Sequence, residues 1–328
     1  MKRYGLAAIL PLMLGLAVPG PALAAGKAAS SRTVELVPQL AKGDRLTLEI
    51  TKTRTQSGRP AAGGKGFQVV EVEVIQADEK GYLIGWTSRR SAVLGPDGKP
   101  KKLPPQAARF AAMYDGVQMI FQLSPRFELV GLKNFEQVQA LMTRSVDKLL
   151  EMMPQPPEQK AQVRKAMTRM LATPELLSQA FGKGISLFFS TGRLELPEKG
   201  AVELDYRFPL PIGGGVIPAK MVMEVTKLDR AAKRATVSMT TKMDPVKAAE
   251  AMRAAMAEMA RQMGKPAPTE KDLPRFEVRD EGTFVMDLAT NLPLSVEHTR
   301  TAVAGPGRRV DTMKIVRKPA APKEPERK

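Results

Sequence analysis

The chain has 328 residues, a formal net charge of +17, 43% hydrophobic residues and no cysteine. The apolar fraction and the 26% of charged residues are typical of a folded globular protein and exclude a wholly disordered one. The lack of cysteine excludes disulfides, cysteine-ligated metals, thiol catalysis and a lipid-modified N-terminal cysteine. With His298 as the single histidine, we expect neither a cofactor nor an enzymatic function.

The first residues have the pattern of a secretory signal peptide. Lys2 and Arg3 give a positive start, an apolar stretch follows over 6–18, and Ala-Leu-Ala at 22–24 fits the small-x-small cleavage rule. The apolar stretch is shorter than the roughly 20 residues that a transmembrane helix needs. We therefore expect cleavage directly after this site and a periplasmic or secreted product without a lipid anchor.

Residues 25–131 are predicted to form a first β-rich unit. Its hydrophobic residues alternate with polar ones, which is typical of half-buried antiparallel strands. The predicted elements are strands over 46–50, 70–74 and 82–87, a helix over 105–114, and strands over 117–123 and 126–130.

Residues 132–197 are predicted to be a helical insertion. Asn134, with Gln137 three residues later, resembles a capping box that opens a helix to about residue 153. A second helix ends near residue 171, and Thr173 is the expected cap of a third that ends at Gly182.

Residues 198–318 are predicted to form a second β-rich unit. Its elements are strands over 202–208, 221–225 and 236–243, a helix over 245–263, and strands over 276–278, 284–288, 294–301 and 310–316. The final stretch, 319–328, contains only Pro, Ala, Lys, Glu and Arg and is expected to be a disordered tail.

The two β-rich units follow one plan, in which Lys-Gly precedes the first strand, a hairpin and a proline-started helix follow, and a hairpin closes the unit. Internal duplication and independent use of a common strand order both explain this plan. We predict an α+β fold with two tandem curved antiparallel sheet units, half-barrel-like, each with a helix, and a helical insertion between them.

Methionines gather on one side of the helix predicted over 245–263, within about 60° of arc. This stripe fits an ordinary core, an apolar cavity for a lipid-like or peptide ligand, or a thioether Cu(I) site, and the lack of nearby His or Cys speaks against a metal. The residues expected to line a cavity are Met252, Met256, Met259 and Met263 on the helix, with Trp86, Tyr206 and His298 on the sheet.

His298 is in phase with Leu294 and Val296, so it is expected on the buried face of its strand. A histidine there is either a core residue hydrogen-bonded to the backbone or a titrating group. No nucleophile elbow or complete phosphate-binding loop accompanies it in the sequence, which favours the first interpretation.

A basic face is predicted on the second helix of the insertion, from Arg164, Lys165 and Arg169. It fits either a solvated surface or a surface that docks an anionic membrane or envelope polymer. Nucleic acid is not an expected partner, because aromatic residues make up 5% of the chain and no nucleic-acid-binding motif is present.

The closing hairpin carries a resemblance. Its sequence is Glu281-Gly282-Thr283-Phe284-Val285-Met286-Asp287, running into Asn291-Leu292-Pro293-Leu294-Ser295. This pattern resembles exported bacterial β-rich proteins of unassigned function with curved half-barrel sheets. More distantly it is similar to the periplasmic lipoprotein-carrier fold, an open barrel that holds acyl chains under a helical lid. The resemblance implies binding of a hydrophobic ligand without a fixed set of ligand residues.

The sequence therefore favours a soluble exported envelope protein, non-enzymatic, that binds a hydrophobic or amphiphilic small molecule or envelope component between curved sheet and Met-rich helices. The alternative is a structural or interaction module that docks anionic envelope components through its basic surfaces. Weak salt dependence of binding would favour the first function and steep dependence the second.

Overall fold

The computed structural model describes residues 32–57, 64–103, 108, 115–152, 155–209, 216–262 and 276–319. The signal peptide predicted at 1–24 and nearly all of the predicted tail lie outside the described residues, as does most of the helix predicted over 105–114.

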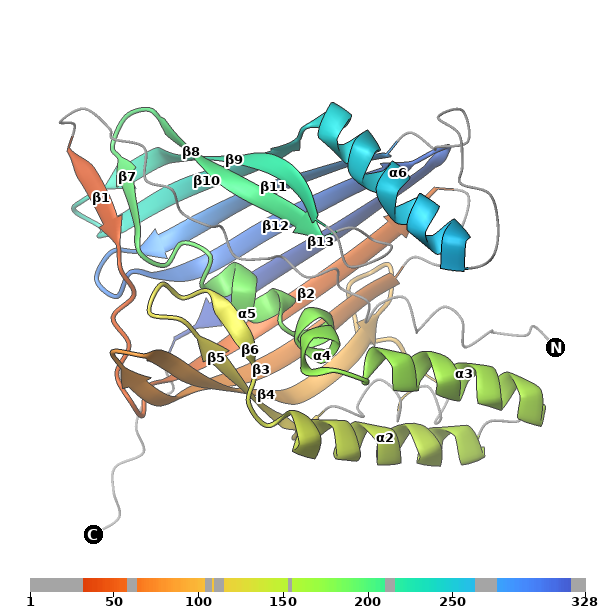
Figure 1. Ribbon diagram of the computed structural model, residues 1–328. Helices are drawn as coiled ribbons and strands as arrows, with labels where there is room; N and C mark the ends of the chain where they lie inside the picture. The colour runs from red at the N-terminus through yellow and green to blue at the C-terminus, as the bar shows by residue number, and fades with distance from the viewer. Residues whose placement is uncertain are drawn as a thin grey trace, which may run out of the picture.

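One curved antiparallel sheet dominates the described part of the chain (Figure 1). From edge to edge its strand order is β6-β5-β4-β3-β2-β13-β12-β11-β10-β9-β8. The first group of strands along the chain is β2 (Arg45–Gln56), β3 (Gly64–Asp78), β4 (Gly81–Leu94), β5 (Gln118–Leu123) and β6 (Leu129–Leu132). The second group is β8 (Ala201–Pro209), β9 (Val216–Asp229), β10 (Arg234–Met243), β11 (Phe276–Asp287), β12 (Leu292–Ala304) and β13 (Gly307–Lys318).

The two groups of strands join where β2 pairs with β13. The register runs from Thr47 opposite Lys318 to Gln56 opposite Arg309. The α+β prediction with curved antiparallel sheets is confirmed, and the structure adds that β2 and β13 join the two groups of strands into one sheet. The predicted domain boundaries stay predictions.

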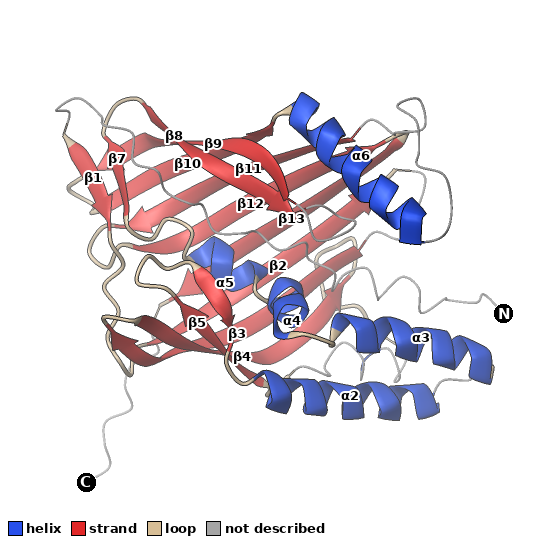
Figure 2. Ribbon diagram, viewed as in Figure 1, coloured by secondary structure: helices blue, strands red, loops and turns tan. Residues whose placement is uncertain are grey.

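The helices lie on one side of the sheet, together with a two-stranded ribbon of β1 (Thr33–Leu36) and β7 (Leu194–Pro197) (Figure 2). The helices are α2 (Phe135–Met152), α3 (Pro157–Met170), α4 (Pro174–Phe181), α5 (Lys183–Phe188) and α6 (Pro245–Gln262). In Figure 1, α6 crosses one end of the second group of strands, and α5 lies over the middle of the sheet.

Local signals explain where these helices begin. Thr173 caps α4, because its hydroxyl accepts a hydrogen bond from the backbone of Leu176. Asp244 caps α6 by accepting from the backbone N–H of the third following residue at 3.1 Å. The capping box expected at Asn134 is wrong in detail. Its side-chain oxygen accepts instead from the backbone of Ile120 at 2.8 Å, which ties the start of α2 to β5.

The two faces of the sheet differ sharply. Along β8, Leu204 and Tyr206 are buried on the face toward the helices, which we call the inner face, whereas Glu203 and Asp205 are exposed on the opposite, outer face. Such alternation is typical of an antiparallel sheet with one solvated side. One continuous apolar core covers the inner face of both strand groups, and both Ile84 of the first group and Phe284 of the second are fully buried in it.

The strand prediction missed the length of β11. Two separate strands, 276–278 and 284–288, were expected, but β11 runs without interruption through these residues. A Cβ atom at Gly282 would lie 3.1 Å from Cε of Met239, so the glycine allows close packing within a strand.

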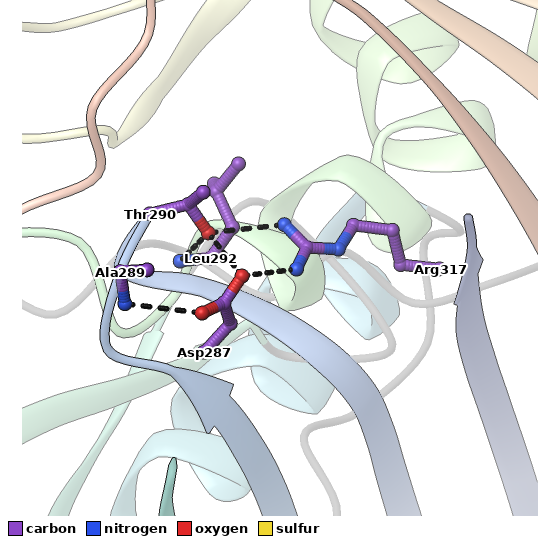
Figure 3. A network of polar contacts seen from close by, with 5 residues as sticks. All are labelled: Asp287, Ala289, Thr290, Leu292 and Arg317. Carbon is purple, nitrogen blue, oxygen red and sulfur yellow. Dashed lines mark hydrogen bonds and ion pairs between the residues drawn. The ribbon is translucent and has the colours of Figure 1, made fainter. Parts of the chain in front are cut away.

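The turn between β11 and β12, which carries the resemblance noted above, is held by a polar network (Figure 3). The Asp287 carboxylate accepts hydrogen bonds from the Ala289 backbone, the Thr290 hydroxyl and Arg317 of β13, the last at 2.7 Å. Asn291 has a φ of 53°, a left-handed conformation that asparagine tolerates well. The hairpin turn is therefore fixed to the neighbouring strand by side chains as well as by the ladder.

Candidate functional site

A row of polar side chains crosses the otherwise apolar inner face. Thr241 of β10 pairs with Asp280 of β11, Asp280 with Arg300 of β12, Arg300 with Asp311 of β13, and Asp311 with Arg54 of β2. Side chains directly opposite one another on a sheet are neighbours. These five residues, which we call the inner polar row, therefore lie side by side across the join between the two strand groups.

Asp280 and Arg300 form a buried ion pair at the centre of the row. Both Arg300 Nε and Nη2 donate to the Asp280 carboxylate at 2.7 Å, and the two side chains are 1% and 3% exposed. Burial alone raises the pKa of Asp280, but the hydrogen bonds and charge of Arg300 outweigh burial and bring the pKa well below its usual range. The pair therefore stays ionised within the core.

The second carboxylate of the row, Asp311, accepts a hydrogen bond on each of its oxygens. Asp311 accepts hydrogen bonds from Nε of Arg54 at 2.6 Å and from Nε of Arg309 at 2.7 Å. A carboxylate held between two guanidinium groups has favourable charge and geometry on both oxygens.

Two lysines lie beside this row. Lys52 of β2 is two residues before Arg54 on the same face, and Lys183, the first residue of α5, is 8% exposed. Neither lysine forms a hydrogen bond or ion pair with any residue in the described ranges. Burial, reinforced by Arg300, lowers the pKa of Lys183 to about 7, with Asp280 and other carboxylate charge opposing. Burial also lowers the pKa of Lys52.

Two neutral polar side chains near the row also lack partners. His298 of β12 is 1% exposed, and neither ring nitrogen has a hydrogen-bond partner. Its Nε2 lies 3.6 Å from the Asp280 carboxylate, which is too far for a hydrogen bond. The buried hydroxyl of Tyr206 also has none. Burial lowers the pKa of His298 and raises that of Tyr206, so both side chains are neutral at pH 7.

The sheet residues predicted to line a cavity are all buried on the inner face. Trp86 packs beneath α5, where a Cβ atom at Gly184 would lie 3.1 Å from Cζ2 of the indole ring. His298 is two residues before Arg300 on the inner face of β12, and Tyr206 contacts Phe208, whose ring centroid lies 5.4 Å from Cζ of Arg300. Trp86 is therefore in contact with a helix, and the other two side chains lie at the polar part of the inner face.

The methionine stripe is only partly within view. Met252 is buried on α6 and Met256 is half-buried, whereas the side chain of Met259 and all of Met263 lie outside the described residues. Ala248 belongs to the continuous core, so the same side of α6 faces the sheet. The role of the stripe as a lining stays a prediction.

The predicted basic face lies on α3. Arg164 forms an ion pair with Asp147 of α2 at 2.9 Å, Lys165 is exposed, and the side chain of Arg169 is outside the described part. The pair with Asp147 reduces the net positive charge that Arg164 offers to a partner.

Sequence reasoning found His298 and Tyr206 but missed the inner polar row. A signal was present: Arg300 is in phase with Val296 and His298, and Asp280 is in phase with Val278. A charged residue in the hydrophobic phase of a strand indicates a buried charge, and such residues are retained only with partners or for a function.

The described residues contain no group of three or more His, Cys, Asp or Glu side chains placed to hold a metal ion. None of the described helices combines the length and the apolar character that crossing a membrane requires.

No family model and no curated protein sequence matches the chain. Among solved structures, the chain is similar to lipovitellin, in a structure that describes lipid–protein interactions, at 9% identity and a TM-score of 0.45. The likeness covers 87% of this chain and 27% of the lipovitellin chain, so this chain spans about a quarter of that protein's length. It concerns the β-rich fold alone.

Proposed function

We propose that this protein is an exported, non-enzymatic protein of the cell envelope that binds an amphiphilic ligand on the inner face of its sheet, beneath the helices. One observation carries the proposal. The buried inner face is apolar on both sides of a polar row, and beside that row the Tyr206 hydroxyl and both ring nitrogens of His298 are buried without a hydrogen-bond partner. Two lysines lie there as well, Lys183 with 8% of its surface exposed and the half-buried Lys52, and neither forms an ion pair with a described residue.

Each unpartnered buried polar group destabilises a fold by about 1–3 kcal/mol. A ligand with a polar end would supply the missing hydrogen bonds, and its apolar part would lie on the surrounding core residues. Burying an acyl chain stabilises a complex by about 0.8 kcal/mol per methylene, so useful affinity needs few specific contacts.

The helical cover suits such a ligand. Met142 of α2 and Met252 of α6 are buried, and Met256 is half-buried on the same helix. Methionine is flexible and polarizable, and it adapts to apolar ligands of different shape. The methionine-bearing helices would therefore be the adaptable side of the site and the sheet its rigid side.

Native mass spectrometry tests the proposal. The protein would be purified without detergent from the cells that export it and measured before and after extraction with organic solvent. We expect a discrete extra mass that extraction removes, and recovery of a bound state when oleate is added to the extracted protein. Bare protein before extraction together with no uptake of oleate would overturn the proposal.

The alternative function, docking to anionic envelope components through basic surfaces, keeps one supporting observation, since Lys165 is exposed on α3. Binding to anionic vesicles that weakens steeply with salt, and that Lys165→Glu weakens further, would favour it. Retention of an extracted amphiphile independent of salt would favour binding on the inner face.

A further inference from the structure

The charge balance around the inner polar row indicates the chemical class of the missing partner. Asp280 and Asp311 each already accept short hydrogen bonds from arginine side chains. Lys52 and Lys183 add two ammonium groups to the same place, and neither forms an ion pair or hydrogen bond with a described residue. Each oxygen of the two carboxylates thus accepts a hydrogen bond from an arginine, whereas the two lysines have no carboxylate partner among the described residues.

The two lysines converge on one location although they come from different elements. Lys183 begins α5, which packs against β12, the strand that carries His298 and Arg300. The charges of Lys52, Asp280, Arg300 and Asp311 all act on its ammonium group. Lys52 pairs with Met313, which in turn pairs with His298, so Lys52 and His298 belong to one cross-strand row directly beside the inner polar row.

The neutral side chains at this place can also donate. The Tyr206 hydroxyl and one ring N–H of neutral His298 are donors without acceptors in the described structure. His298 Nε2 lies 3.6 Å from the Asp280 carboxylate, and the Tyr206 ring contacts Phe208, whose ring centroid lies 5.4 Å from Cζ of Arg300. Both donors therefore lie close to the buried ion pair. Two ammonium groups and two neutral donors match the several lone pairs of an oxyanion.

We propose that the polar end of the ligand is an anionic head group, a carboxylate or a phosphate, bound by Lys183 and Lys52 with Tyr206 and His298 as additional donors. The inference rests on the proposed function, because the apolar chain attached to this head group would lie on the inner face around the row. A bound anion would neutralise ammonium groups that are otherwise costly to bury.

The test compares ligands that share a chain and differ in the charge of the head group. Binding of oleate, oleyl phosphate and oleyl alcohol would be measured by titration calorimetry at pH 7, below the concentration at which they aggregate, with inorganic phosphate as the chain-free probe. We expect the two anions to bind about tenfold or more tightly than the alcohol, the gain of one charge-assisted hydrogen bond. Inorganic phosphate should bind far more weakly.

Substitutions assign the effect to the lysines. Lys183→Met and Lys52→Met should each weaken binding of the anions toward the affinity of oleyl alcohol and leave the alcohol unchanged. Lys227→Met, at an exposed position of β9, is the matched control and should change none of the affinities. If a variant fails to fold, the comparison of the three oleyl ligands on the unsubstituted protein still tests the proposal.

The outcomes separate the two proposals. Equal affinity for oleate, oleyl phosphate and oleyl alcohol would overturn the anionic head group and leave binding of an amphiphile intact. No binding of any oleyl compound would overturn the proposed function itself. Tight binding of inorganic phosphate without a gain from the chain would show a site for a free anion and would contradict a head-group site. Under the proposal, the tighter of the two anionic ligands shows whether the site prefers a carboxylate or a phosphate head group.

Discussion

Replacing Asp280 with asparagine is the sharpest test of the buried charge arrangement. The substitution keeps the size of the side chain and removes the charge that faces Arg300, whose side chain is 3% exposed. Arg300 also remains ionised, because its pKa is raised by Asp280 although burial lowers it. The variant would therefore bury a guanidinium group without its carboxylate.

The magnitude follows from the geometry of the pair. Removing one partner of a buried, hydrogen-bonded ion pair costs about 3–5 kcal/mol, because the other charge stays desolvated. Asp280 makes two hydrogen bonds of 2.7 Å to Arg300 and is 1% exposed, which places it in this class. Asp280→Asn should thus lower the free energy of unfolding by about 3–5 kcal/mol. Adding Arg300→Met should recover most of the loss, because no charge is then stranded.

Urea unfolding followed by the fluorescence of Trp86, the single tryptophan, would measure the change. Asp205→Asn is the matched control, because Asp205 pairs with Lys220 on the exposed outer face and should lose far less stability. The lowered pKa of Asp280 adds a pH dependence: its contribution is complete above the unfolded pKa of about 4 and is lost as pH falls toward the folded pKa. A loss below about 1 kcal/mol at pH 7 would refute the buried pair.

Three further substitutions test the account. Gly184→Val should lower stability by about 1–3 kcal/mol and shift the emission of Trp86, since even a Cβ atom at this position meets the indole at 3.1 Å; unchanged emission would contradict the packing of α5. The pKa of Lys183 is lowered from 10.5 to about 7 in the folded state, so between these pH values the unfolded state binds more protons. The urea midpoint should therefore rise with pH over this range, and it should rise less in Lys183→Met. Equal slopes in the two proteins would contradict the burial of the Lys183 ammonium group. Met256→Lys should abolish retention of the extracted amphiphile while Met256→Leu keeps it, and retention with only a loss of stability would assign Met256 to the core.

The sequence predicted those strands and helix starts that depend on neighbouring residues alone. Alternation indicated β2 and β8 because each has one buried and one solvated side, and Thr173 and Asp244 marked helix starts because capping is a short-range hydrogen bond. The pairing of β2 with β13 joins distant parts of the chain, and no local pattern in Ile50 or Ile315, which lie opposite each other, indicates it. The same holds for the short ribbon of β1 and β7.

The candidate site was predicted in its apolar part and missed in its charged part. Trp86 and His298 follow from hydrophobic phase, which is a local property. Asp280 was missed because Glu281-Gly282 next to it is typical of a turn, and charges in strands are outward by default. Lys183 was missed because α5 is a single short helix directly after Gly182, where the preceding helix was expected to end. The partners of these charges are set by strand pairing, which the sequence alone does not show.

Binding of a brominated fatty acid next to Trp86 would test the central claim most directly. Bromine quenches indole fluorescence at short range, and Trp86 is the only indole in the chain, buried on the inner face against α5. A ligand bound between the sheet and its helices should quench Trp86: we expect quenching by bromostearate that saturates with binding, exceeds the quenching of free tryptophan, and is reversed by excess oleate. Stoichiometric binding of bromostearate with unchanged Trp86 emission would place the ligand elsewhere and contradict a site between the sheet and its helices.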